Sequence, residues 1–377
     1  MFALGALGAF YFAGFVAGCF VGPNLLLRIG HIRTFTVAAA IIAVSILMMP
    51  LTVTPVAWFV LRAVNGLFVA VLFMTLESWL NERATNETRG NILSAYVAVG
   101  LGALIIGQWF LLIAPPSTFE LFTIGAVAFC LCLVPVGMTR LPQPVLRPVS
   151  LLSLRRLLAL SPVGAMGCVT SGLVTSAFWT LGPIYVQSLG FTIRGLALFM
   201  TVFIAGGALS QWPLGWLSNH MDRRWMIAAI CMVASICGIA LSLFGWLLVQ
   251  EPTFFFVLVF VLGATMLPLY SLSVAHANDR LSRDEFVDAS AVLLLIQAAL
   301  SVPGPLLAAL VMSVAGPYAL FLFTALAHAA MAFFAFTRSR ICEAPPEETR
   351  KAFAALAQGS PIALELDPRG PEQPPPS

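Results

Sequence analysis

The chain of 377 residues is 60% hydrophobic and only 9% charged, with a formal net charge of +3. A water-soluble domain carries about 25% charged residues, so this composition excludes one. The lysines and arginines lie mostly in short segments between apolar runs, so the small positive charge gives no reason to expect a nucleic-acid partner.

A helix crosses a bilayer core of about 30 Å with about 20 apolar residues. Runs of that length recur along the chain and predict an all-α membrane protein with eleven spanning helices. The first five predicted helices are Phe2–Leu27, Thr34–Leu51, Ala57–Leu80, Asn91–Ile113 and Leu121–Gly137. The other six are Pro162–Val186, Leu196–Leu217, Trp225–Val249, Phe254–Ala277, Ala289–Val311 and Tyr318–Phe336.

These runs predict an N-terminal bundle (1–137), a basic linker (138–161), a C-terminal bundle (162–338) and a tail (339–377). In the linker, leucines and the pair Arg155 and Arg156 between Ser150 and Leu160 fit either a short helix in the membrane interface or a plain basic linker. The tail is rich in proline, glutamate and small residues, so we expect it to be mostly disordered.

Basic residues accumulate in alternate loops, and such loops face the cytoplasm. The opposite loops contain only Arg194. We therefore expect a multi-pass protein of the cytoplasmic (inner) membrane, with a cytoplasmic C-terminus and with Met1 outside. The basic residues of the alternate loops and tail are Arg28, Arg33, Arg83, Arg89, Arg140, Arg147, Arg155, Arg156, Arg223, Arg224, Arg280, Arg283, Arg338, Arg340, Arg350, Lys351 and Arg369.

The seven cysteines do not have the spacing of a zinc site or of a disulfide framework, so no metal is expected. A nucleotide-binding loop G-x-x-x-x-G-K-[ST] is not found in the sequence, and no cofactor is expected. No constellation of histidine, acid and cysteine near one membrane face stands out, so the sequence does not favour an enzyme.

The two predicted bundles show weak self-similarity, which is typical of transporters built from repeats. A shift that superposes Ala13-Gly14 on Ala205-Gly206 also places Leu25 on Leu217. It brings the basic turn at 28–33 over the turn at 220–224. Under this alignment the counterpart of Pro162–Val186 falls about 30 residues upstream of Met1. We therefore expect the first half to lack one helix, either because the start codon lies upstream or because the helix has been lost.

Three patterns in the sequence indicate one family. The turn Gly215-Trp-Leu-Ser-Asn-His-Met-Asp-Arg-Arg224, apart from Asn219 and Asp222, is similar to the loop motif G-x-L-A-D-R-x-G-R-R of the major facilitator superfamily of secondary transporters. Arg62-Ala-Val-Asn65-Gly66 resembles the R-x-x-Q-G of its fourth helix. The segment from Glu77 to Gly90, together with Arg28-Ile-Gly-His31 and Gln211-Trp-Pro-Leu-Gly215, resembles the YcaD-type branch of the superfamily.

This resemblance implies two pseudo-symmetric bundles that rock about a midplane site and move a small molecule, with protons as the coupling ion. The expected partners are the lipid bilayer, the substrate and protons, and the expected state is a monomer. The substrate and the direction of transport are not fixed by these patterns. The alternatives are a non-transporting membrane sensor or scaffold, or an inactive truncated transporter.

Arg62 is the most informative candidate because a charge inside a membrane is costly and faces a cavity or a partner. It could bind an anionic group or take part in proton coupling, whereas the alternative is that it snorkels outward along its own stem. The candidates for the central cavity are Arg62, Asn65, Gln108, Trp179, Tyr185, Gln211, Tyr270 and Gln297. For each polar candidate other than Arg62, the alternative is a packed or hydrogen-bonded role in the protein interior. His276 and His328 are weaker candidates for a titrating group.

Glu77 lies one turn from the cytoplasmic end of its predicted helix, and we expect it to pair with Arg28 or Arg33 in a cytoplasmic gate. The alternative is an exposed carboxylate at a helix end, which contributes little. The gate candidates are Arg28, Gly30, Arg33, Glu77, Asn219, Asp222, Arg223 and Arg224. Gly14, Gly18 and Gly22 are spaced four apart on one helix face, which predicts close helix packing.

Overall fold

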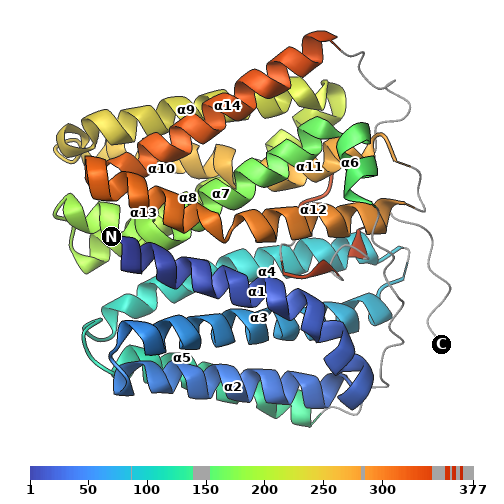
Figure 1. Cartoon of the computed structure of the whole chain (residues 1–377), viewed down its shortest axis with the longest axis vertical. Coiled ribbons are helices and arrows are strands. Elements are labelled where there is room, and N and C mark those ends of the chain that lie inside the picture. The colour runs from blue at the N-terminus through green and yellow to red at the C-terminus, as the bar shows by residue number, and fades with distance from the viewer. Residues whose placement is uncertain are drawn as a thin grey trace.

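The computed structural model describes residues 1–85, 87–138, 153–281, 285–341, 353–356, 359–361 and 366–367. All regular elements in these ranges are helices. Figure 1 shows them in two groups, α1 to α5 in blue to cyan-green and α7 to α14 in green to red. We call these groups the first and the second bundle.

The first bundle consists of α1 (Phe2–Ile29), α2 (His31–Leu51), α3 (Pro55–Arg83), α4 (Arg89–Trp109), a short 3-10 turn η1 (Phe110–Leu112) and α5 (Glu120–Gly137). The second consists of α7 (Pro162–Ser188), α8 (Ile193–His220), α9 (Arg223–Leu248), α10 (Pro252–Met266), α11 (Leu269–Asn278), α12 (Phe286–Leu300), α13 (Pro303–Ala315) and α14 (Ala319–Ile341). A short helix α6 (Leu154–Leu160) precedes the second bundle.

Ten described spans are long and apolar enough to cross a membrane, and α6 with α7 adds an eleventh across a bend of 111°. The predicted number of spanning helices is therefore confirmed. Two predicted helices are each divided in the structure, between α10 and α11 and between α12 and α13. The breaks adjoin Pro268 and Pro303, which have no backbone N–H to donate within a helix.

The linker helix α6 has one buried apolar face and one exposed basic face. Leu157 is fully buried and packs with Leu160 against α7, α11 and α12, whereas Arg155 and Arg156 are exposed. Arg156 forms an exposed ion pair of 2.5 Å with Glu285 at the start of α12. The predicted linker residues 139–152, with Arg140 and Arg147, lie outside the described residues.

Both bundles contain the same glycine-mediated helix crossing. A Cβ atom on Gly14 of α1 would collide with the carbonyl of Ala63 in α3, and one on Gly66 would collide with the carbonyl of Tyr11. In the second bundle Gly206 of α8 faces the carbonyl of Phe260 in α10, and Gly263 faces that of Phe203. Small residues let helix backbones approach this closely in a membrane. Gly14 and Gly206 are also positions that the sequence alignment of the two halves pairs.

Gly18 and Gly22 continue the same contact along α1. A Cβ atom on Gly18 would meet the carbonyl of Leu67, and one on Gly22 would meet the sulfur of Met74, both in α3. The stripe of small residues on α1 therefore lies where α1 packs on α3.

The bundles differ in how much of their helices is covered. In the most apolar stretch of each spanning segment, the share of buried residues is 0% for α4 and 6% for α5. The corresponding share is 56% for α12 and α13 together and 50% for α14. In the second bundle α7 packs against α12, α13 and α14, and Gly304 of α13 touches the carbonyl of Leu173 in α7. The glycines Gly100, Gly102 and Gly107 of α4 face open space. The first bundle thus has a bare surface where the second bundle is covered by α7.

Candidate functional site

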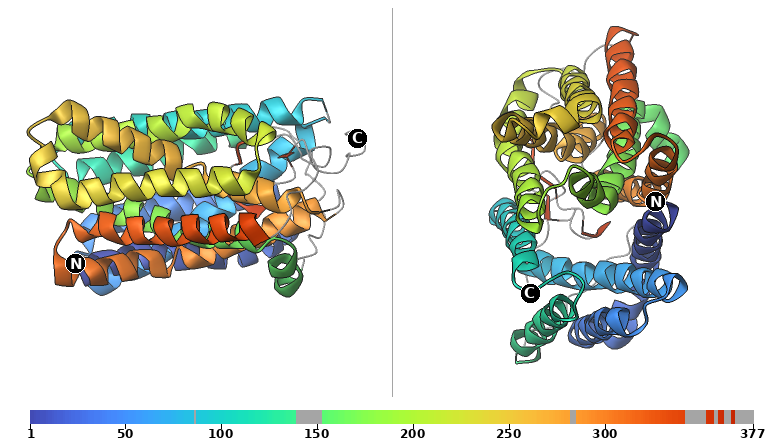
Figure 2. Two further views of the ribbon diagram at one scale, coloured as in Figure 1. Left: turned by 90° about the horizontal axis from the view of Figure 1, so that it is seen from above. Right: turned by 90° about the vertical axis from the view of Figure 1, so that its left-hand side faces the viewer.

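The two bundles meet differently at their two ends. We call the end at which α1 ends at Ile29 and α8 ends at His220 the basic end. At the opposite end Gly5 of α1 touches Pro305 and Ala309 of α13, and η1 packs on the second bundle through Leu111. At the basic end, described pieces of the C-terminal tail lie between the bundles, as the red segments in the right-hand view of Figure 2 show.

Glu77 is the central polar residue at the basic end. It lies on α3, has no exposed surface, and accepts a hydrogen bond of 2.7 Å at Oε1 from the hydroxyl of Tyr96 on α4. Its Oε2 accepts a short hydrogen bond from the hydroxyl of Ser360 in the tail. The carboxylate thus joins two helices of the first bundle to the tail, and a buried carboxylate that retains two hydroxyl donors can be desolvated at tolerable cost.

The predicted ion pair between Glu77 and Arg28 or Arg33 is wrong for this conformation. Both arginines are exposed, whereas Glu77 faces α4 and the tail. Gly30, with a φ of 78°, lies in the left-handed region and forms the turn between α1 and α2. Its role as a gate residue stays a prediction.

The turn between α8 and α9 holds a buried ionic cluster. Arg223 donates to Asp279, the residue that follows α11, at 2.5 Å and to the carbonyl of Ala275 in α11 at 2.8 Å, and the two charged side chains are 1% and 3% exposed. Asp222 caps α9 by accepting from the backbone N–H of Arg224 at 2.9 Å, and it also pairs with the Arg224 side chain at 2.7 Å. The second-half loop motif therefore fastens α9 to α11.

Asp222 lies outside the spanning segments, and its environment has two opposed effects. Burial raises the pKa of its carboxyl, but the hydrogen bonds and the charge of Arg224 outweigh burial and leave the pKa below its ordinary value. Asp222 is therefore a structural anion at neutral pH. Asn219, the other departure from the family motif, accepts from Arg223 at 3.4 Å and from the backbone of Phe353 at 2.9 Å.

Deeper in the second bundle, Gln297 of α12 is 5% exposed and donates to Ser171 of α7 at 3.3 Å. Tyr270 of α11 is fully buried, and its hydroxyl has no hydrogen-bond partner among the described residues. It belongs to one buried cluster with Leu93 of the first bundle and Leu366 of the tail. A buried side-chain oxygen of Gln211 on α8 likewise has no partner in the described part of the chain.

In the first bundle, the half-buried Arg62 of α3 stacks its guanidinium over the ring of Tyr11 on α1, 4.7 Å from the ring centroid. Such a contact partly compensates an arginine within a membrane. Asn65 is 6% exposed and donates to the carbonyl of Leu61 at 2.9 Å. Gln108 of α4 similarly donates to the carbonyl of Leu104 at 3.3 Å. Both amides therefore have a local partner within their own helix.

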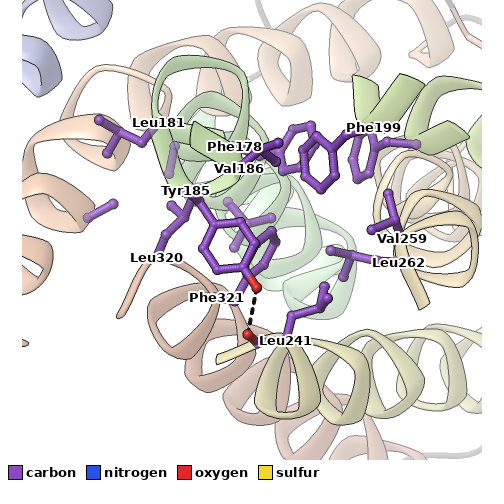
Figure 3. Close-up of a cluster of buried hydrophobic side chains, with 14 of the residues drawn as sticks. Phe178, Leu181, Tyr185, Val186, Phe199, Leu241, Val259, Leu262, Leu320 and Phe321 are labelled. Carbon is purple, nitrogen blue, oxygen red and sulfur yellow. Dashed lines mark hydrogen bonds between the residues drawn. The ribbon is translucent and has the colours of Figure 1, made fainter. Parts of the chain in front are cut away.

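Tyr185, a candidate for the central cavity, takes the alternative interior role in this structure. It is fully buried in the core of the second bundle, where its hydroxyl donates to the carbonyl of Leu241 on α9 at 2.7 Å (Figure 3). Its ring packs edge-on against Phe321 of α14. Trp179 is partly buried and packs edge-on against Phe178 and Phe203 of the same core. Aromatic packing therefore explains both positions.

The two histidines considered as titrating groups are also buried. His276 of α11 is paired with Arg280 at 2.9 Å, and His328 of α14 with the carbonyl of Thr324 at 2.7 Å. The described residues contain no group of three or more metal-ligating side chains.

Tyr96, Ser271, Asp279 and the tail were not among the predicted site residues. Tail residues Leu356, Ser360, Leu366 and Asp367 are at most 5% exposed, so the expectation of disorder is corrected for the described pieces. The apolar stretches around Leu356 and Leu366 were the available signal, because a solvated tail has little reason to carry them.

Comparison with known proteins adds the family context. A sequence profile described as Major Facilitator Superfamily matches residues 1–249 and again residues 164–366. A protein of Escherichia fergusonii named "Uncharacterized MFS-type transporter YcaD" is 27% identical over 314 residues, covering 82% of this chain and 79% of that protein. A protein of Salmonella newport with the same name is 27% identical over 313 residues, with the same two coverages.

Two solved structures share the fold. The nucleoside transporter NupG matches with a TM-score of 0.67 and 14% identity over 89% of this chain and 90% of that chain. A bacterial homologue of the human lysosomal transporter Spinster, in an inward-facing and unoccupied conformation, matches with a TM-score of 0.66 and 14% identity over 90% and 96%. At these identities the likeness extends to the fold only.

Proposed function

The chain belongs to the Major Facilitator Superfamily, and from this premise we propose that it is a secondary active transporter that moves a small molecule across the cytoplasmic membrane by alternating access. The observation that carries the proposal is the asymmetry of the interface between the bundles. They touch directly at one end through Gly5 and α13, whereas at the basic end tail residues lie between them. Two bundles closed at one end only are one state of an alternating-access cycle.

The orientation follows from the basic residues. Arg28, Arg33, Arg223 and Arg224 all lie at the end where the tail is found, and loops rich in lysine and arginine remain in the cytoplasm. We therefore assign the basic end and the C-terminus to the cytoplasm. In that orientation this conformation is closed toward the outside.

The proposed energy source is a proton gradient, with Glu77 as the candidate carrier. It is a fully buried carboxylate at the interface of the bundles, and the hydroxyls of Tyr96 and Ser360 hold it. Protonation would remove the cost of keeping this charge away from water and thereby favour a different packing of the bundles. Arg62 is the proposed contact for an anionic group of the substrate.

The bare surface of α4 and α5 bears on the same proposal. In the second bundle the equivalent surface is filled by α7, whose backbone touches Gly304. We propose that in the membrane another apolar helix packs over α4 and α5. Small residues with open space around them suit such a contact.

The test is accumulation of a solute by proteoliposomes. A library of small metabolites is first screened for compounds that raise the unfolding temperature of the purified protein, since a ligand of the native state stabilises it. Uptake of each hit is then measured with an imposed pH gradient, with and without a proton ionophore. Arg62→Ala is expected to abolish uptake, whereas Arg194→Ala, which removes an exposed arginine in the first turn of α8, retains it. Uptake by the Arg62→Ala protein at the wild-type rate contradicts the substrate role of Arg62.

A further inference from the structure

The described pieces of the C-terminal tail form a specific contact with both bundles. On the first bundle, Ser360 donates to Glu77, and the carbonyl of Asp367 accepts from Arg89 of α4 at 3.5 Å. On the second bundle, the backbone N–H of Phe353 donates to Asn219 at 2.9 Å and that of Leu356 donates to Ser271 at 3.2 Å. The tail thus connects α3 and α4 with α8 and α11.

Apolar contacts accompany these hydrogen bonds. Leu356 and Leu366 are 5% and 0% exposed and belong to one cluster with Leu93 of α4 and Tyr270 of α11. Burial of two leucines removes substantial apolar area from water, which favours the bound tail. The contact is therefore not limited to polar groups at a rim.

Glycines shape the surfaces that receive the tail. A Cβ atom on Gly215 of α8 would collide with the ring of Phe353, and one on Gly359 of the tail would collide with the Glu77 carboxylate. Any larger residue at either position would displace the tail. The fit therefore depends on residues in the tail and in the helices together.

We propose that the C-terminal tail is an internal ligand of the basic end, and that it holds the bundles in this conformation until it is released. The proposal rests on the transport function proposed above. For the bundles to close at the basic end, Glu77 and Tyr96 have to approach α8 and α11, and the tail occupies the space between them. Because the tail is tethered to α14, its effective concentration at this site is high without any outside partner.

Hydrogen exchange of the full chain in detergent tests the contact without a transport assay. Acceptors on Asn219 and Ser271 bind the amides of Phe353 and Leu356, so these amides are expected to exchange at least about tenfold more slowly than in a free peptide. The release variant Leu356→Asp with Leu366→Asp is expected to remove this protection. The control variant Leu154→Asp with Leu158→Asp changes two exposed leucines of α6 and is expected to retain it. Unprotected amides in the native chain overturn the proposal.

Initial rates of transport test the regulatory role. The release variant is expected to transport several-fold faster than the native chain, and the control variant at the native rate. If exchange shows that the native tail is bound, and the native chain and the release variant still transport at equal rates, the contact does not regulate transport. That result overturns the regulatory role. If neither protein transports any hit, the proposed function fails and the regulatory role with it, while the exchange result still decides whether the tail binds at the basic end.

Discussion

The buried ion pair between Arg223 and Asp279 gives a prediction whose size follows from its geometry. The two charges are 2.5 Å apart and at most 3% exposed, and the arginine also donates to the carbonyl of Ala275. Removing one partner of such a pair leaves an uncompensated charge away from water, which costs about 3 to 5 kcal/mol. Asp279→Ala is therefore expected to lower the free energy of unfolding by about that amount.

The exposed pair between Arg156 and Glu285 is the matched control. Its distance is also 2.5 Å, but its side chains are 60% and 25% exposed. Exposed pairs contribute about 0 to 1 kcal/mol, so Glu285→Ala is expected to change the free energy of unfolding by no more than that. The comparison isolates burial from distance, because the two pairs have the same separation.

Reversible unfolding in mixed micelles of a mild detergent and dodecyl sulfate, followed by circular dichroism, measures both variants. The double variant Arg223→Met with Asp279→Leu replaces the charges by apolar side chains and is expected to regain most of the lost stability, since apolar replacement of a buried pair is often neutral or stabilising. An Asp279→Ala protein no less stable than Glu285→Ala would refute the reasoning. So would a double variant less stable than Asp279→Ala.

Three further predictions concern single positions. Gly14→Val is expected to prevent accumulation of folded protein, because its side chain would collide with the α3 backbone. Gly102→Ala places its side chain in open space and should fold normally, and size-exclusion profiles compare the two variants. Tyr185→Phe loses one buried hydrogen bond, so it is expected to lower the free energy of unfolding by about 1 kcal/mol and to leave transport unchanged. Loss of transport at native stability would instead show that Tyr185 acts in the transport site. The pKa of the Asp222 carboxyl is lower in the folded protein than its ordinary value, so its contribution to stability is complete above about pH 5 and is lost as the pH falls through the folded pKa. Unfolding measured from pH 6 downward should show this loss in the native chain and not in Asp222→Asn.

The sequence by itself determined the number of spanning helices, the internal repeat and the family. Each depends on local properties: the length of an apolar run, a basic turn, or a glycine at a fixed position in both halves. The packing face of α1 could be located because Gly14, Gly18 and Gly22 are spaced four apart, which is a local property of the sequence. The basic loop residues were found in the same way.

Only the tertiary structure decided which polar residues meet. In helices that are apolar on all sides, the pattern does not distinguish the face toward lipid from the face toward the core. The sequence therefore left open whether Tyr185 faces the central cavity or the core, and its contact with Leu241 places it in the core. Glu77 was expected to pair with a nearby arginine but instead binds Ser360, 283 positions away, because the tail returns between the bundles. A contact at that separation leaves no periodic signal in the sequence, since it depends on how the two bundles pack around the tail.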